Sequence, residues 1–127
     1  MIYSLLAIAG GGALGALSRH GLNSGITHLF KLSFPFGTLC ANILGSFLMG
    51  VLIAYFARYG NPSQEVRLFL TVGFLGAFTT FSTFSLDSMS LYMRGEFGYL
   101  SLYILGSVAL SLLGIFAGSA IIWKVLP

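Results

Sequence analysis

The sequence predicts an all-α integral membrane protein with four transmembrane helices, organised as one domain over residues 1–127. Of the 127 residues, 57% are hydrophobic and only 7% are charged, whereas soluble domains carry about 25% charged residues. Because so few charged residues cannot cover the surface of a soluble protein, we expect a lipid bilayer to surround the chain. A transmembrane helix needs about 20 mostly apolar residues. Four segments meet this requirement: residues 2–22, 36–56, 66–91 and 99–125.

The loops between these segments carry helix start and stop signals. Pro35 precedes the second segment, and proline is tolerated in a first helical turn. Asn61 is predicted to cap the third helix, with Pro62 at its first position. Arg94 and Gly95 are predicted to end that helix, because a basic last turn followed by glycine favours a helix C-terminus. No loop is long enough to hold a separate domain.

Lysine and arginine residues are evenly divided between the two sides of the predicted bundle. Four spans place both termini on one side, so each side receives three basic residues. The positive-inside rule needs an excess on one side to fix the orientation. The balance therefore favours insertion in both orientations and pairing as an antiparallel, dual-topology homodimer. If Arg19 is buried in the bundle, the count leaves a weak bias instead. The basic residues are scattered singly, which gives no basic patch for nucleic acid: Arg19, Lys31 and Arg94 on one side, and Arg58, Arg67 and Lys124 on the other.

The most informative segment lies in the third predicted span, where hydroxyl side chains are concentrated. From Thr79 to Ser85, five of seven residues carry a hydroxyl, and the other two are Phe81 and Phe84. Polar groups at membrane depth must find partners or face a wet or ion-filled cavity. The segment, with Ser82 and Thr83 at its centre, therefore predicts either the lining of a small polar pathway or an unusually polar contact between helices.

The second and fourth predicted spans each carry a stripe of polar side chains spaced four residues apart, which places each stripe on one helical face. Such a stripe can line a pathway. An asparagine can equally serve as a helix contact worth about 1 kcal/mol or less, and serines in membrane helices often bond to the preceding turn of their own helix. Both interpretations stay open for the two stripes: Thr38, Asn42 and Ser46 in the second span, and Tyr103, Ser107 and Ser111 in the fourth.

The chain lacks the residue combinations that catalysis and proton-coupled export require. It has no nucleophile–base constellation, phosphate-binding glycine loop or metal-binding cluster, so we expect no enzymatic activity. Asp87 is the only acid inside a predicted span, and a proton-coupled exporter needs a titratable carboxylate in the membrane. The candidate pathway residues are neutral donors and rings with positive edges, which suit a small anion. Arg19 either extends to the membrane interface or sets a positive potential at a vestibule.

The segment Gly73–Ser85 (GFLGAFTTFSTFS) resembles the signature of the Fluc (CrcB) fluoride channel family. The resemblance extends to Gly15–Arg19 (GALSR), to Gly37–Gly45 (GTLCANILG) and, more loosely, to the serine stripe of the fourth span. It implies a fluoride-selective passive channel of the bacterial inner membrane that exports cytoplasmic fluoride down its electrochemical gradient. It further implies a dual-topology homodimer with two antiparallel pores and a third helix that is broken, although only two glycines weaken that helix locally.

The resemblance also assigns roles to individual residues. It implies that Phe81 and Phe84 present their ring edges to fluoride, that Asn42 lies in the pore, and that Arg19 lies near the vestibule. A polar track on the facing helices is expected from four further side chains: Thr38, Tyr103, Ser107 and Ser111.

A structural sodium ion at the dimer interface is expected from the same resemblance, held by the backbone carbonyls of Gly76 and Thr79. Two other functions are weighed against the channel. A small four-span, proton-coupled multidrug exporter would need an acid in the first span, where this chain has none. A non-conducting subunit of a membrane assembly would tolerate apolar replacements throughout Thr79–Ser85.

Overall fold

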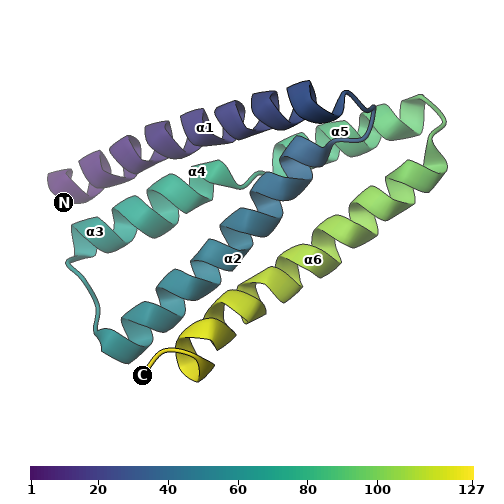
Figure 1. The fold of residues 1–127 in the computed structure, drawn as a ribbon. Helices are drawn as coiled ribbons and strands as arrows, with labels where there is room; N and C mark the ends of the chain where they lie inside the picture. The colour runs from purple at the N-terminus through teal and green to yellow at the C-terminus, as the bar shows by residue number, and fades with distance from the viewer.

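A computed structural model describes the whole chain, Met1–Pro127, as four long helical rods (Figure 1). Each rod is long and apolar enough to cross a membrane, which confirms the four predicted spans. Three rods are single helices, and the third consists of four shorter helical segments in series. Their bounds are α1 Ile2–Phe30, α2 Phe36–Tyr59, α3 Gln64–Leu68, the π-helix η1 Phe69–Leu75, α4 Gly76–Phe78, α5 Phe81–Met93 and α6 Phe97–Lys124.

Two of the predicted helix ends are wrong. Helix α1 continues eight residues beyond its predicted end at Leu22 and stops only at Lys31, which adopts a left-handed conformation with φ 48°. No proline interrupts this stretch, so the backbone stays helical even though its side chains become more polar. The cap of α3 is Ser63 rather than Asn61, because the Ser63 hydroxyl accepts the Val66 N–H at 3.3 Å. Asn61 instead accepts a bond from Arg67.

The predicted end of the third rod is confirmed in detail. Gly95 adopts φ 73°, a conformation that glycine reaches without a Cβ penalty. The N–H groups of Gly95 and Glu96 donate to the carbonyls of Tyr92 and Leu91, both at 3.0 Å. This pair of bonds closes the helix as a Schellman motif and turns the chain sharply into α6.

Glycines allow the rods to approach each other at backbone distance along two seams. Helix α1 packs along η1 and α4, and α2 packs along α6. A Cβ placed on Gly15 would lie 2.1 Å from the Phe74 carbonyl oxygen, and one on Gly118 would lie 2.1 Å from the Phe47 carbonyl oxygen. Small residues at such contacts let membrane helices gain close packing. The second seam sets the distance between α2 and α6.

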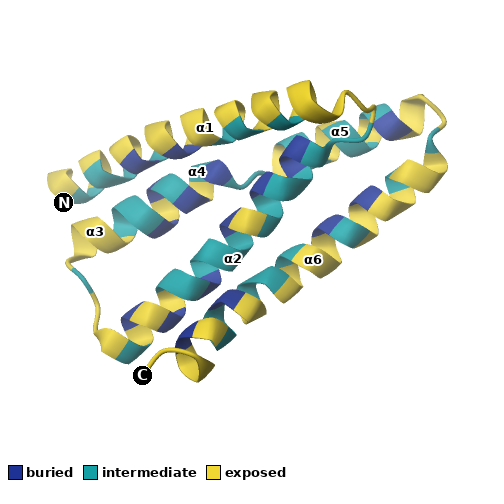
Figure 2. Cartoon of the chain, viewed as in Figure 1, coloured by how far each residue is buried: buried dark blue, intermediate teal, exposed yellow.

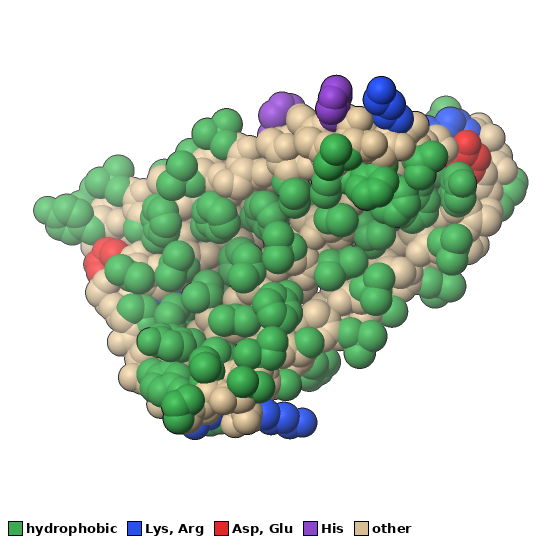
Figure 3. Space-filling view, in the orientation of Figure 1, with side chains coloured by type: hydrophobic (Ala, Val, Ile, Leu, Met, Phe, Trp, Pro, Cys, Tyr) green, Lys and Arg blue, Asp and Glu red, His purple; other side chains and the backbone are tan.

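The outer surface is apolar over most of its extent. Only 18 of the 127 residues are buried, and large hydrophobic side chains are exposed on all four rods. Figure 2 marks the exposed residues along the chain. In Figure 3, hydrophobic side chains cover the middle of the visible face, and most charged side chains lie toward its ends. This distribution suits a protein that lipid surrounds rather than water.

Candidate functional site

The third rod is broken between α4 and α5, in the middle of the hydroxyl-rich segment. Thr79 and Thr80 are both extended, with φ −86° and ψ 157° for Thr79 and φ −153° and ψ 125° for Thr80. Helix α5 then restarts with Thr80 as its N-cap, whose hydroxyl accepts the Thr83 N–H at 3.1 Å. The third helix is therefore broken, as the family resemblance implied, and the break exposes polar backbone at membrane depth.

Two side chains from other rods bind this break. The amide of Asn42, on α2, makes two hydrogen bonds to the backbone of Thr80. Arg19, on α1, donates from Nε to the Ala77 carbonyl at 3.1 Å and from Nη1 to the Thr83 hydroxyl at 3.3 Å. The guanidinium therefore spans the gap between α4 and α5. The guanidinium does not extend to a helix end, which excludes the interpretation that Arg19 reaches the membrane interface.

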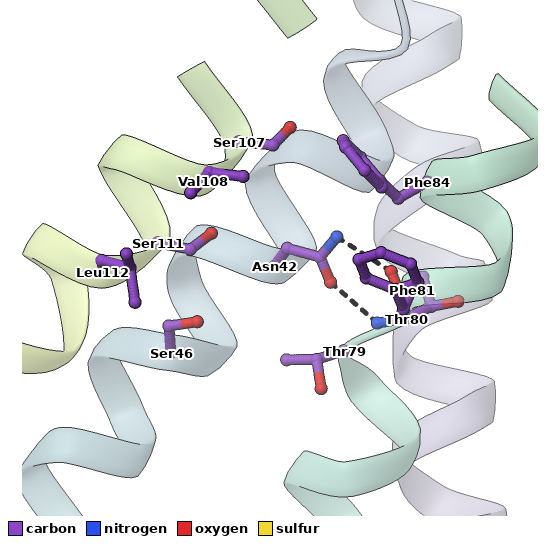
Figure 4. A pocket seen from close by; sticks show the side chains of 10 residues that line it. All are labelled: Asn42, Ser46, Thr79, Thr80, Phe81, Phe84, Ser107, Val108, Ser111 and Leu112. Carbon is purple, nitrogen blue, oxygen red and sulfur yellow. Dashed lines mark hydrogen bonds between the residues drawn. The ribbon is translucent and has the colours of Figure 1, made fainter. Parts of the chain in front are cut away.

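A cavity of about 340 Å³ opens beside the break, between α2, α5 and α6. Figure 4 shows the side chains of its ten lining residues together with the bonds between Asn42 and Thr80. The lining is a mixture of hydroxyls, one amide, two phenyl rings and two aliphatic side chains, with no charged group. The residues are Asn42 and Ser46 from α2, Thr79 and Thr80 from the break, Phe81 and Phe84 from α5, and Ser107, Val108, Ser111 and Leu112 from α6.

Ser107 is the most informative residue in this lining. Its side chain is buried, with a relative exposure of 6%, and its hydroxyl oxygen has no hydrogen-bond partner. Leaving a buried polar group unsatisfied costs about 1–3 kcal/mol. An unpartnered hydroxyl at the edge of a cavity is therefore a ready donor for a small polar guest.

The two phenylalanines of the hydroxyl-rich segment lie one turn apart on α5 and both line the cavity. Their ring centroids are 5.4 Å apart at an interplanar angle of 47°. Phe84 also packs against Tyr103, with centroids 5.1 Å apart. Phe81, by contrast, is 78% exposed. A large ring left so open on an isolated chain marks a face that another surface can cover.

Several of the predicted pathway residues lie outside the cavity lining. Tyr103 is fully buried, and its hydroxyl donates to Asp87 Oδ2 at 2.9 Å. Thr38 is also buried, with a relative exposure of 4%. Ser82 is exposed and lies near the Thr80 hydroxyl. The Thr83 hydroxyl accepts the bond from Arg19. The structure therefore gathers part of the predicted set around the cavity and leaves these four outside its lining.

The family resemblance assigned no individual role to four of the lining residues, Ser46, Thr80, Val108 and Leu112. Ser46 was placed on the same face as Asn42, and Thr80 belonged to the hydroxyl-rich segment, so their pattern carried a usable signal. Val108 and Leu112 each follow a predicted serine by one position on α6. Nothing in their chemistry distinguishes them from lipid-facing residues, so only the packing of α6 against α2 reveals them.

The chemistry of the break also fits a small hard cation at the carbonyls of Gly76 and Thr79. In a continuous helix these carbonyls would accept the N–H groups of Thr80 and Thr83. Those two donors are instead bonded to Asn42 Oδ1 and to the Thr80 hydroxyl. Both carbonyls therefore lack their usual helical partner. Backbone carbonyl oxygens of this kind can replace the water around a cation.

The sequence matches known proteins over nearly its full length. Residues 6–119 match the family described as "CrcB-like protein, Camphor Resistance (CrcB)". A "Fluoride-specific ion channel FluC" of Rhodopseudomonas palustris is 51% identical over 122 residues, which cover 96% of this chain and 97% of that protein. Proteins of the same name from Cereibacter sphaeroides and Geobacter sulfurreducens are 52% and 49% identical. These two matches cover 94% and 91% of this chain and 94% and 93% of the respective relatives.

Proposed function

The chain belongs to the CrcB family, and we propose that it is a multi-pass membrane channel through which cytoplasmic fluoride leaves the cell passively. It is a channel and not an enzyme. The main support for a fluoride pathway is the buried, unpartnered Ser107 hydroxyl, which lines a cavity together with Phe81 and Phe84. Hydroxyl donors and positive ring edges attract a small anion without placing a fixed charge in its path.

The driving force needs no fuel. Neutral hydrogen fluoride crosses lipid and ionises in a near-neutral cytoplasm, where the anion becomes trapped. A negative-inside membrane potential favours anion exit by about 2.3 kcal/mol per charge for each 100 mV. A narrow pathway with fixed donors disfavours the larger chloride ion, which protects the potential. Along this pathway we assign donor contacts to Ser107 and Ser111, ring-edge contacts to Phe81 and Phe84, and marginal polar positions to Thr38, Ser82, Thr83 and Tyr103.

Fluoride efflux from liposomes tests the function directly. Liposomes that contain the purified protein and internal fluoride should release it when a potassium ionophore sets the interior negative. Chloride-loaded liposomes should release far less under the same potential. Protein-free liposomes give the background rate. Fluoride release at that background rate from liposomes with a verified content of folded protein would contradict the channel assignment.

The functional unit is proposed to be an antiparallel homodimer. The exposed Phe81 ring and the open side of the cavity both need a covering surface, and a second copy supplies matching apolar chemistry. Arg19 bonds inside the bundle, so it does not count toward the basic residues at the membrane surface. Its side then has two basic residues, Lys31 and Arg94, against three on the other side. This near balance gives little preference for one orientation.

Dual topology predicts mixed labelling of a single site in intact cells. We expect a cysteine introduced at either terminus, in a Cys40→Ser background, to give both a reactive fraction and a protected fraction toward a membrane-impermeant thiol reagent. The reason is that each terminus would face outward in about half of the molecules. Permeabilised cells serve as the control and should label fully. Labelling of only one class, all or none, would contradict insertion in both orientations.

A structural sodium ion is proposed at the dimer interface, held by the carbonyls of Gly76 and Thr79. When bound, it would offset the partial negative charge of carbonyls that lack helical partners. Replacing sodium with N-methyl-glucamine should therefore lower the thermal stability of the purified dimer. Equal stability in the two cations would contradict this site.

Asp87 is proposed to have a structural role rather than a role in proton coupling. Its carboxylate accepts the hydroxyl of the fully buried Tyr103. Asp87→Asn keeps an acceptor for that hydroxyl, so we expect fluoride efflux that still follows the membrane potential and ignores an imposed pH gradient. Asp87→Leu removes the acceptor and should lower stability by about 1–3 kcal/mol, measured by thermal unfolding. Proton-driven uptake of fluoride against its gradient, lost in Asp87→Asn, would contradict this role.

A further inference from the structure

The break between α4 and α5 interrupts the backbone hydrogen bonding of the third rod, which is costly in the hydrophobic part of a membrane. Thr80 is the extended N-cap of α5, so its C=O begins the hydrogen bonding of that helix, but its N–H has no helical acceptor. In lipid, an unsatisfied backbone N–H finds no water to replace that acceptor. Some other group must bond to Thr80 if the break is to persist at this position.

The side-chain amide of Asn42 supplies the acceptor that the Thr80 N–H lacks and also bonds to the Thr80 carbonyl. Its Oδ1 accepts the Thr80 N–H at 2.7 Å, and its Nδ2 donates to the Thr80 carbonyl at 3.1 Å. The Thr80 N–H can only donate and the carbonyl can only accept, so just one orientation of the amide satisfies both. The side-chain amide therefore pairs with Thr80 as the backbone of a neighbouring strand would.

This pairing has consequences on both sides of the break. The Thr80 N–H is drawn away from the carbonyl of Gly76, which is thereby left free. The residue that follows Thr80 is Phe81, so the position of its ring depends on the same anchor. One of the two Nδ2 hydrogens remains unbonded to Thr80, and Asn42 lines the cavity.

We propose that Asn42 is a positioning residue whose amide fixes the break at Thr80, and that it acts on permeation through Phe81 and Gly76. The inference rests on the proposed function only for its effect on efflux, because the pairing itself is a property of the fold. Ser46, one turn further along the same face of α2, lines the same cavity and has no bond to the break. It therefore provides a matched control.

Amide hydrogen exchange at Thr80 measures the pairing directly. The full-length protein, labelled with ¹⁵N-threonine and reconstituted in nanodiscs, gives an amide signal for Thr80 that is assigned by its loss in Thr80→Ser. We expect slow exchange in the wild type and at least tenfold faster exchange in Asn42→Leu, which keeps the side-chain shape but removes both hydrogen bonds, including the acceptor of the Thr80 N–H. Ser46→Ala should exchange at the wild-type rate, and the Thr71 amide should not change in either variant.

Fluoride efflux on the same preparations separates the two hypotheses. Asn42→Leu should form a dimer by size-exclusion chromatography, with efflux reduced at least tenfold. Thr80 exchange within twofold of the wild-type rate in that variant would overturn the positioning role, whatever its efflux. A protected Thr80 amide in a wild-type protein that conducts no fluoride would leave the positioning role standing and overturn the proposed function.

A second variant keeps the inference testable if Asn42→Leu does not fold. Asn42→Asp retains an oxygen acceptor for the Thr80 N–H but loses the donor to its carbonyl. We expect Thr80 exchange within threefold of wild type, while efflux falls because a negative charge now lines the cavity. Exchange more than tenfold faster than wild type in Asn42→Asp would overturn the inference.

Discussion

Replacing Phe84 or Phe81 with isoleucine should leave a folded dimer whose fluoride efflux falls by a factor of ten or more. Both rings line the cavity one turn apart, beside the unpartnered Ser107 hydroxyl. Isoleucine keeps comparable bulk and apolar character but removes the positive ring edge. A tenfold loss corresponds to a barrier higher by about 1.4 kcal/mol, which is in the range expected for the loss of one direct contact to the ion.

A packing role for these rings predicts a different result. A swap that nearly conserves volume usually costs less than about 1.5 kcal/mol of stability and would leave transport intact. Liposome efflux and size-exclusion chromatography on the same preparation distinguish the two roles. Phe97→Ile, at the start of α6 and outside the cavity, is a control that should conduct normally. A monodisperse Phe84→Ile dimer with wild-type efflux would exclude an essential ring edge at that position. If a variant aggregates, methionine replaces isoleucine in the same test.

Adding one methyl group at Gly118 should destabilise the protein and impair conduction together. A Cβ at this position would lie 2.1 Å from the Phe47 carbonyl oxygen and 3.0 Å from the Val51 nitrogen. Both are backbone atoms, so no side-chain rotation can relieve the clash, and α2 and α6 must move apart. Overpacking of this kind typically costs about 1–3 kcal/mol. The two helices carry two of the walls of the cavity, so the separation should also weaken efflux.

The matched control for this change lies on the same helix. A Cβ added to Gly98 would meet no atom of the rest of the protein within 4 Å, so Gly98→Ala should change stability by no more than about 0.5–1 kcal/mol. Thermal unfolding of the two purified variants, compared with wild type, gives the measurement. Equal unfolding temperatures for Gly118→Ala and Gly98→Ala would show that the α2–α6 seam is more compliant than its geometry indicates.

Local chemistry determined much of the architecture. Long apolar segments must form helices in lipid because no water is present to bond their backbone groups, so the four spans follow from composition. The helix stop at Gly95 follows from the conformational freedom of glycine. The cluster of hydroxyls and phenylalanines in Thr79–Ser85 predicted the candidate site, because hydroxyl groups that face lipid alone find no hydrogen-bond partners.

Tertiary structure alone decided how that cluster is organised. The residues themselves favoured one continuous third span, with a break implied only by family resemblance, because a helix is the best local solution for its backbone. Asn42 lies 38 residues from Thr80 in the chain, and Arg19 lies 58 residues from Ala77. Their hydrogen bonds satisfy backbone groups that lose helical partners at the break. No residue pattern within the third span predicts these bonds. The sequence determined which segments enter the membrane, because that depends on each segment's own transfer free energy. Where the third helix breaks, and which hydroxyls then face a cavity, depends on partners that only folding brings together.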